Sequence, residues 1–168
     1  MGRSLRGAKY LPDFHATFPA IDESLAVEEI SLPDDTLFTN QIGGFSKDGD
    51  SYHMIIDHNH LPPAPWINVI SNPNFGFTVS ESGIGYTWCE NSGENRLTSW
   101  SNDPILDQPG EAIYLRDEET GQYWSPTYLP VPDNMPYEVI HGAGYSSFKH
   151  ISHGIQTELK YFTDKTDP

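Results

Sequence analysis

From Leu37 onward the chain consists of short segments in which apolar and polar residues alternate, separated by turns rich in Gly, Pro, Asn and Asp. Phe75, Phe77 and Val79, for example, are each followed by a small or polar residue. Side chains two residues apart lie on the same face of a strand, so this period predicts half-buried strands. No helix of normal length is expected after residue 30. The chain is therefore predicted to be an all-β protein of antiparallel strands.

The turn residues divide this region into predicted strands. A hairpin is expected over 37–57, with its turn at Lys47–Asp50 and with Tyr52, Met54 and Ile56 on one face. Further strands are expected at 66–70, 75–79, 86–88, 112–117, 122–126, 137–140, 145–150 and 155–162. Residues 1–36 are predicted to form an extended arm, in which 21–30 could form a short helix. The last strand is expected to be an edge or a point of truncation.

Composition excludes several classes of function. The 168 residues suit one domain, and the formal net charge of −15 argues against nucleic acid and anionic membranes as partners. No signal peptide and no membrane span of about 20 apolar residues is present, so a cytoplasmic location is expected. The single Cys89 excludes an internal disulfide. A nucleophilic thiol needs an electropositive pocket, whereas Glu90 adds negative charge, which favours a packed cysteine.

The stretch 75–104 combines aromatic rings with many short polar side chains. Its rings are Tyr86, Trp88 and Trp100, and its polar side chains are Glu81, Glu90, Asn91, Glu94, Asn95, Arg96, Asn102 and Asp103. A pyranose presents C–H faces that pack on aromatic rings and hydroxyls that need paired donors and acceptors. Residues after Trp88 lack a hydrophobic period and are expected to form a long ordered loop. The stretch therefore suggests carbohydrate binding.

Structural roles for the same residues remain open. Trp88 could be a core ring, and Arg96 could pair with Glu94. The three asparagines of the loop could hold its own turns. Two histidine pairs, His58 with His60 and His150 with His153, could suggest a metal, but a zinc site needs a third ligand, and no metal is predicted. Acidic pairs, Glu81 with Glu90 or Glu94 with Asp103, could suggest hydrolysis, although sequence spacing does not set their separation, and no catalytic residue is assigned.

Several ordered motifs resemble one known family. Over residues 64–130 they are WINVI, NPNFGF, VSESGIGYTW, ENRLTSWSNDP, GEAIYLRDEETG and WSPT, and HGAGYSSFKHISHGI follows. Together they resemble the amino-terminal sandwich of glycoside hydrolase family 94, most closely the cyclic β-1,2-glucan synthase branch. The resemblance implies an antiparallel β-sandwich of the super-sandwich, galactose-mutarotase-like type. It assigns 37–168 to a carbohydrate-binding sandwich that is incomplete at its carboxyl end.

The resemblance also implies an activity for the parent enzyme. Family 94 enzymes cleave β-linked saccharides with inversion, using inorganic phosphate as co-substrate and an acidic residue on a separate helical barrel. Because this chain contains no such barrel, it is expected to be inactive alone and to position a β-glucan oligosaccharide for the barrel domain, with no cofactor and with a homodimer as a further option. The residues implied to face the glucan are Tyr86, Trp88, Asn95, Arg96, Trp100, Asn102 and Asp103. The alternatives are a freestanding carbohydrate-binding module and a structural or dimer-forming sandwich.

Overall fold

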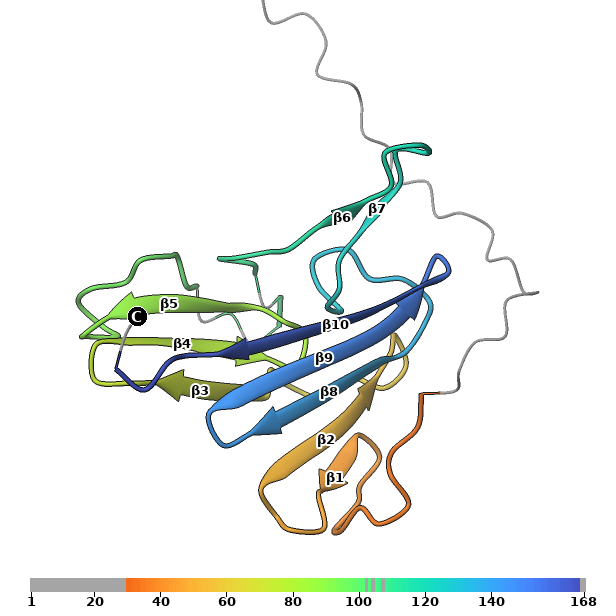
Figure 1. Cartoon of the computed structure of the whole chain (residues 1–168), viewed down its shortest axis with the longest axis horizontal. Coiled ribbons are helices and arrows are strands. Elements are labelled where there is room, and N and C mark those ends of the chain that lie inside the picture. The colour runs from red at the N-terminus through yellow and green to blue at the C-terminus, as the bar shows by residue number, and fades with distance from the viewer. Residues whose placement is uncertain (1–29, 102, 104, 107, 167–168) are drawn as a thin grey trace, which may run out of the picture.

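Antiparallel strands make up all the regular secondary structure that the structure describes. It is a computed structural model, and it describes residues 30–166 except 102, 104 and 107 (Figure 1). The ten strands are β1 Gly43–Phe45, β2 Ser51–Ile56, β3 Ile67–Ser71, β4 Phe75–Ser80, β5 Gly85–Cys89, β6 Leu115–Arg116, β7 Tyr123–Trp124, β8 Tyr137–Gly142, β9 Tyr145–Ser152 and β10 Ile155–Phe162. The all-β prediction is thus confirmed. Of the arm predicted over 1–36, residues 1–29 lie outside the described residues, as does the short helix considered for 21–30, apart from residue 30.

The larger sheet contains five strands in the order β1-β2-β8-β9-β10. The predicted first hairpin is present, with Gly43 opposite Met54 and Phe45 opposite Tyr52. Its turn contains Gly49 at φ 80°, a conformation that glycine adopts without a Cβ penalty. The pairing of β2 with β8 joins segments about eighty residues apart, as in Ile56 opposite Tyr137. The β8–β9 and β9–β10 hairpins then add β9 and β10, and β10 forms one edge of the sheet.

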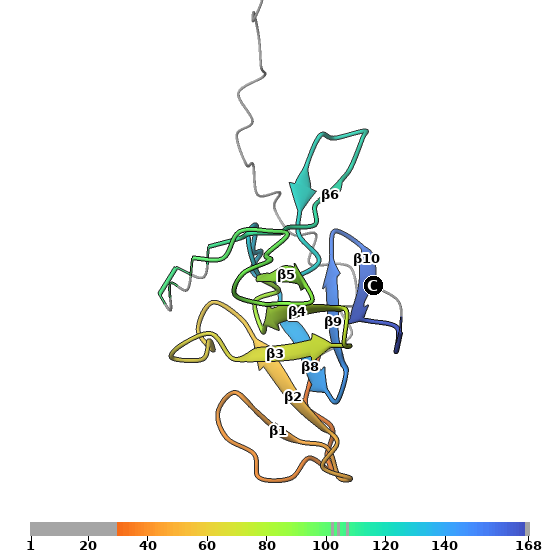
Figure 2. The ribbon, with the colours of Figure 1, turned by 90° about the vertical axis from the view of Figure 1, so that its left-hand side faces the viewer.

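The smaller sheet contains β3, β4 and β5, joined by short turns. The Asn72 side chain accepts hydrogen bonds from the backbone N–H groups of Asn74 and Phe75, and Gly83 turns the chain at φ 86°. Figure 2 shows this sheet in front of β8 and β9. A separate two-stranded hairpin, β6–β7, projects from the two sheets (Figure 1). It is shorter than predicted, because only Leu115–Arg116 and Tyr123–Trp124 pair.

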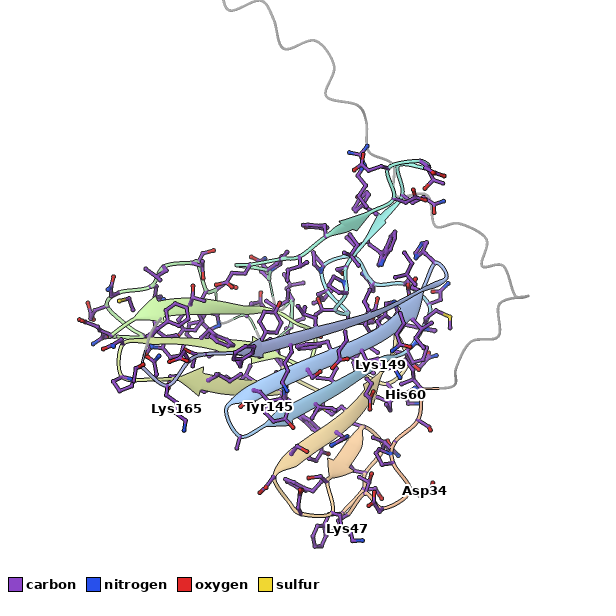
Figure 3. All side chains as sticks on the ribbon, viewed as in Figure 1. Asp34, Lys47, His60, Tyr145, Lys149 and Lys165 are labelled. Atoms are coloured by element: carbon purple, nitrogen blue, oxygen red, sulfur yellow. The ribbon has the colours of Figure 1, made fainter. Side chains whose placement is uncertain are left out.

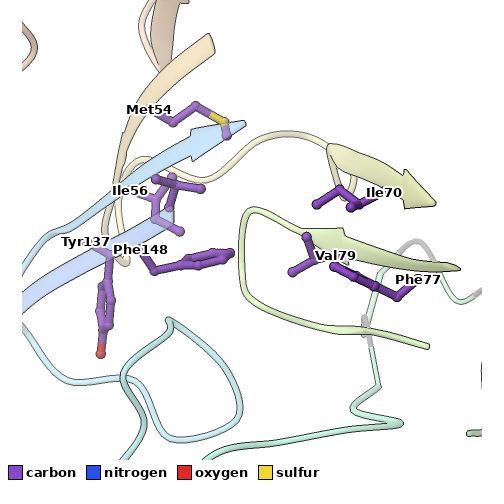
Figure 4. Packing of buried hydrophobic residues seen from close by; sticks show 8 residues of the cluster. Met54, Ile56, Ile70, Phe77, Val79, Tyr137 and Phe148 are labelled. Carbon is purple, nitrogen blue, oxygen red and sulfur yellow. The ribbon is translucent and has the colours of Figure 1, made fainter. Parts of the chain in front are cut away.

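The hydrophobic core lies between the two sheets. The larger sheet contributes side chains from β2, β8 and β9, and the smaller sheet contributes side chains from β3 and β4 (Figure 4). The core residues are Met54, Ile56, Ile70, Phe77, Val79, Tyr137, Val139 and Phe148. Met54 and Ile56 alternate along β2, and Phe77 and Val79 alternate along β4, as the period of two predicted. The fold is therefore a β-sandwich with one continuous apolar layer.

Polar side chains also connect the two sheets, beside the apolar layer. Asn68 on β3 donates to the carbonyl oxygens of Gly142 and Tyr145 (both 2.9 Å) and to the Ser146 hydroxyl (3.1 Å). His141 on β8 contacts Ser146 through Nδ1 (2.9 Å) and the Trp66 carbonyl through Nε2 (3.1 Å). Because a carbonyl only accepts, Nε2 carries the proton and the neutral ring satisfies both partners. Burial correspondingly lowers the pKa of His141.

A buried ion pair lies between β9 and the segment before β8. His150 is fully buried, its Nε2 is 2.8 Å from the Asp133 carboxylate, and its Nδ1 is 3.1 Å from the Pro136 carbonyl. Both partners only accept, so the imidazolium form supplies the two required protons. The Tyr137 ring stacks on this imidazole at a centroid distance of 3.7 Å. Burial alone would raise the pKa of Asp133, but hydrogen bonding and charge attraction from His150, together with hydrogen bonds from Ser152 and the Met135 N–H, outweigh it and lower that pKa.

This ion pair predicts acid sensitivity. Asp133 has a lower pKa in the folded chain than its ordinary value of 3.8, so the unfolded chain binds the proton first as the pH falls. The stabilisation from Asp133 is therefore complete above the unfolded pKa and is lost as the pH falls toward the folded one. Urea unfolding at a series of pH values should show a steeper loss below about pH 4 in the wild type than in Asp133→Asn. Equal slopes would contradict the assignment.

Truncating the centre of the core tests the packing. Phe148 is fully buried and its ring contacts Tyr161 edge-on at 5.8 Å between centroids. Phe148→Ala should lower the free energy of unfolding by about 3–5 kcal/mol, because a cavity remains between the sheets. Phe162→Ala is the matched control, since that ring is 67% exposed and its removal should change stability by about 0.5 kcal/mol or less. Similar losses in both variants, measured in urea, would contradict this placement of the core.

Candidate functional site

Two of the predicted site residues lie on the outer face of the smaller sheet. In the β4–β5 register, Tyr86 is opposite Thr78 and Trp88 is opposite Gly76. Thr78 and Gly76 alternate with Phe77, which points into the core, so the two aromatic rings lie on the other side of the sheet. Both are nonetheless buried. Trp88 is thus a packed ring, as one alternative held, but it lies outside the core between the sheets.

A glycine allows Trp88 to lie flat on the sheet. A Cβ at Gly76 would be 2.4 Å from Cζ2 of Trp88 and 2.7 Å from Cβ of Ser71, distances that real Cβ atoms do not show. The indole therefore occupies the space above Gly76 that a side chain would otherwise fill. The Tyr86 ring packs beside it, with centroids 5.3 Å apart. Together the two rings form an aromatic layer on the outer face of β4 and β5.

The loop after β5 folds back along that strand. Cys89 N–H donates to the Asn95 carbonyl (3.1 Å), and Leu97 N–H donates to the Thr87 carbonyl (2.9 Å). The Thr98 hydroxyl accepts from Thr87 N–H (2.9 Å) and donates to Glu111 (2.6 Å). The segment thereby extends the smaller sheet irregularly, which explains why a sequence without strand periodicity is ordered here.

Trp100 and Arg96 cover the aromatic layer. The Trp100 ring stacks on Tyr86 with centroids 5.0 Å apart and planes at 19°. The Arg96 Cζ lies 5.7 Å from the Tyr86 centroid and 5.6 Å from the Trp100 centroid. If the Arg96 guanidinium lay on the face of Trp100 that points away from Tyr86, its Cζ would be much farther from the Tyr86 centroid than from the Trp100 centroid. Arg96 therefore flanks the stack as a cation–π partner of both rings, and the far face of the 40% exposed Trp100 is not covered by Arg96.

Arg96 is held by the backbone and not by Glu94. Its Nε donates to the Ser92 carbonyl at 3.2 Å, and the Tyr86 hydroxyl reaches the same oxygen at 3.4 Å. Among the described residues no ion pair joins Arg96 to Glu94, so the structural pairing considered from the sequence is not found. Within this same part of the chain, Nε is the only guanidinium nitrogen with a hydrogen-bond acceptor. The terminal nitrogens are thus left as donors at the edge of the ring stack.

The remaining predicted residues have different surroundings. Asn95 is exposed and contacts the loop through its backbone, and its side-chain amide has no hydrogen-bond partner among the described residues. Asp103 accepts from the N–H groups of Ile105 (2.9 Å) and Leu106 (3.1 Å), which lower its pKa. Asp103 therefore stabilises a turn. Asn102 lies outside the described residues. Of the loop asparagines, Asn91 holds the first turn by accepting from Gly93 and Glu94.

Sequence reasoning missed two exposed apolar residues on the same face. Val69 on β3 pairs with Thr78, the partner of Tyr86, so all three share the outer face. Ile67 lies two residues earlier on β3, and both it and Val69 are more than half exposed. The sequence shows that Ile67 and Val69 alternate with Ile70. It does not show that β3 pairs with β4, which places the two residues on the same face as the aromatic rings. The outer face thus continues from the ring stack to an apolar edge.

The other residues considered from the sequence do not gather into a second site. His60 contacts Asp57, His58 contacts Asn59, and His150 belongs to the buried ion pair. Across the described residues, no three His, Cys, Asp or Glu side chains lie close enough to hold a metal. Glu81 is buried and accepts from Trp66 N–H (2.7 Å), which ties it to the start of β3. In the same described part, no helix is long and apolar enough to span a membrane.

The two packed antiparallel sheets place the chain in the class of β-sandwich domains. Residues 50–168 match the glycosyl hydrolase 94 supersandwich domain. The chain belongs to this family, as the motifs of the sequence had indicated.

Sequence comparison finds longer relatives. The chain is 38% identical over 152 residues to the cyclic beta-(1,2)-glucan synthase NdvB of Rhizobium meliloti (strain 1021), a match that covers 89% of the chain and 5% of that protein. It is 36% identical over 121 residues to the N,N'-diacetylchitobiose phosphorylase of Vibrio furnissii and 32% identical to that of Vibrio proteolyticus, each match covering 70% of the chain and 15% of the relative. The chain thus corresponds to a small part of each of these proteins.

The packing of Trp88 against Gly76 gives a direct test of the aromatic layer. Gly76→Ala should lower the free energy of unfolding by about 1–3 kcal/mol, because the indole must move off the strand. It should also shift the tryptophan fluorescence. Gly93→Ala is the control, because the nearest atom to its Cβ would be 3.4 Å away, in ordinary contact range. If Gly76→Ala were as stable as Gly93→Ala in urea, the described packing of Trp88 would be wrong.

Proposed function

We propose that the outer face of the smaller sheet, with the loop over 90–110, binds a β-glucan oligosaccharide. The far face of Trp100 supports this proposal most directly. One side of the indole is stacked on Tyr86, so the ring is held in place before any ligand arrives. A pyranose that packs its C–H face on the other side would bury apolar area without ordering a mobile side chain.

Arg96 supplies the polar half of the proposed site. Its guanidinium flanks the Tyr86–Trp100 stack at 5.6–5.7 Å from the two centroids. Its Nε is engaged with the Ser92 carbonyl, which fixes the plane of the group. The terminal nitrogens are then directed as a fork that suits two neighbouring hydroxyl oxygens of a saccharide. Asn95 and Asn102 are proposed as further contacts, whereas the turn held by Asp103 is proposed to shape the loop. Trp88 supports the rings from below.

We also propose a role in a larger enzyme, which the family membership supports. We infer that the sandwich positions glucan for inverting phosphorolysis, with inorganic phosphate as co-substrate and a helical barrel that supplies the acid. Support comes from the similarity to the glucan synthase and to the two phosphorylases, of which the chain covers 5% and 15%. The isolated chain is expected to bind saccharide without releasing or consuming phosphate. Phosphate turnover with a β-glucoside by the chain alone would refute this part of the proposal.

Removing the stacking ring tests the binding role. Trp100→Ala should weaken binding of β-1,2-linked glucan oligosaccharides by about 1–3 kcal/mol, because the apolar contact with the sugar face is lost. Isothermal titration calorimetry on the full chain measures the change. Phe38→Ala is the control, since that ring is more exposed than Trp100 but lies before β1, away from the loop.

Three outcomes separate the candidate roles. Binding that Trp100→Ala weakens and Phe38→Ala leaves unchanged supports the proposed site. Binding unaffected by Trp100→Ala would remove this residue from the site, and no binding by the wild type would favour a structural sandwich. Far-ultraviolet circular dichroism of both variants should match the wild type, because Trp100 is not part of the core between the sheets.

A further inference from the structure

We propose that the open edge of β10 pairs with β10 of a second copy of this chain, so that two larger sheets join into one antiparallel sheet. β10 is the last strand of the larger sheet, and within the described residues its only strand partner is β9. Figure 2 shows it at the right margin of the molecule. An edge strand presents a row of backbone N–H and C=O groups that another strand can use.

The two edges of the larger sheet differ in how well they are protected. β1 has three residues, and Leu37 covers its outer side by exchanging two backbone hydrogen bonds with Phe45 (both 2.8 Å). β10 has eight residues and contains no proline. Its register with β9 runs without a bulge from Ile155 to Phe162. Short strands, prolines and bulges are the usual means of protecting an edge, so β10 is the edge that is suited to pairing.

The β9–β10 turn determines which backbone groups of β10 point to the open edge. His153 at φ 53° and Gly154 at φ 71° form a two-residue turn between paired strands. Such a turn closes with a hydrogen-bonded pair, here Ser152 and Ile155, and hydrogen-bonded pairs then alternate along the ladder. Every second residue from Ile155 therefore bonds to β9. The backbone groups that point to the edge, and that have no hydrogen-bond partner among the described residues, belong to Gln156, Glu158, Lys160 and Phe162.

The charged side chains of β10 favour one register for the second copy. Glu158 and Lys160 lie on the outer face of the sheet, because Leu159 between them is opposite the core residue Phe148. In a two-fold arrangement centred on Leu159, Glu158 of each copy is opposite Lys160 of the other. A shift of the partner by two residues in either direction would place Glu158 opposite Glu158 or Lys160 opposite Lys160. Like charges in direct opposition are destabilising, so the centred register is preferred.

Both charges can take part in this contact. Glu158 is exposed, and the described part of the chain contains no ion pair to it. The Lys160 ammonium lies 4.5 Å from the centroid of the Tyr145 ring, which Figure 3 shows at the start of β9. A cation–π contact at an exposed site is weak. It keeps Lys160 on the outer face, from which its flexible side chain can turn to a carboxylate across the edge.

The core face adds an apolar contact at the two-fold axis. Leu159 and Tyr161 are partly buried and pack against the core. In the centred register, Leu159 is opposite Leu159 of the other copy in a non-hydrogen-bonded pair, the kind in which side chains lie closer together. Tyr161 is opposite Thr157 on the same face. The pairing therefore extends the apolar layer from one copy into the next.

The association of the full chain tests the pairing. Sedimentation equilibrium at about 0.15 M salt is suitable, because long-range repulsion between two chains of net charge −15 is screened there. The average mass should rise with protein concentration from that of one chain to that of two. Amide hydrogen exchange should slow in parallel at Glu158 and Lys160, whose N–H groups become hydrogen-bonded. A chain that stays monomeric at about 1 mM, or a dimer without this protection, would overturn the proposal.

Charge-exchange variants test the register. Glu158→Lys and Lys160→Glu should each weaken the dimer about tenfold or more, because like-charged pairs replace both ion pairs. An equimolar mixture of the two variants should associate again, since every Lys then faces a Glu across the edge. Glu119→Lys is the control, because it changes the net charge equally at an exposed position on the β6–β7 hairpin and should not weaken the dimer. Equal losses in Glu119→Lys and Glu158→Lys, or a mixture that stays monomeric, would refute this register.

Discussion

The contact between the two sheets determines where the other parts of the molecule lie. It combines an apolar layer, centred on Phe148, Phe77 and Ile56, with a polar connection from Asn68 through Ser146 and His141. The apolar layer provides most of the stabilisation, since burial of apolar area is non-directional and roughly proportional to area. The polar connection adds direction, because its donors and acceptors are matched in only one relative position of β3 and the β8–β9 hairpin.

Once the inner face of the smaller sheet is fixed, the outer face follows from the strand period. Phe77 and Val79 point inward, so Tyr86 and Trp88, which pair with the intervening residues of β4, must point outward. An outward face with two large rings requires its own cover. Trp100 and Arg96 provide this cover from a loop that hydrogen-bonds along β5. The ring stack therefore forms because the outward rings need a cover, and it leaves one face of the Trp100 indole exposed.

The sequence predicts the local features of this fold well and its long-range features poorly. Alternation along β2 and β4 correctly places Met54 with Ile56, and Phe77 with Val79, on one face of each strand, and the turn at Gly49 lies where the composition placed it. The pairing of β2 with β8 depends on segments that are distant in the chain. The packing of Trp88 against Gly76 depends on the cross-strand register. A period of two says which side chains share a face, but not which face is covered.

The net charge of −15 also constrains the proposed glucan site. A strongly acidic surface repels phosphate-rich polymers at long range, so specific recognition must act over contact distances on ligands that carry little charge. Arg96 fits this requirement, because its charge is shared between two ring faces and its free donors act only at the edge of the stack. We therefore propose that at this site the local balance of donors and acceptors, and not the overall field, selects a neutral hydroxylated ligand.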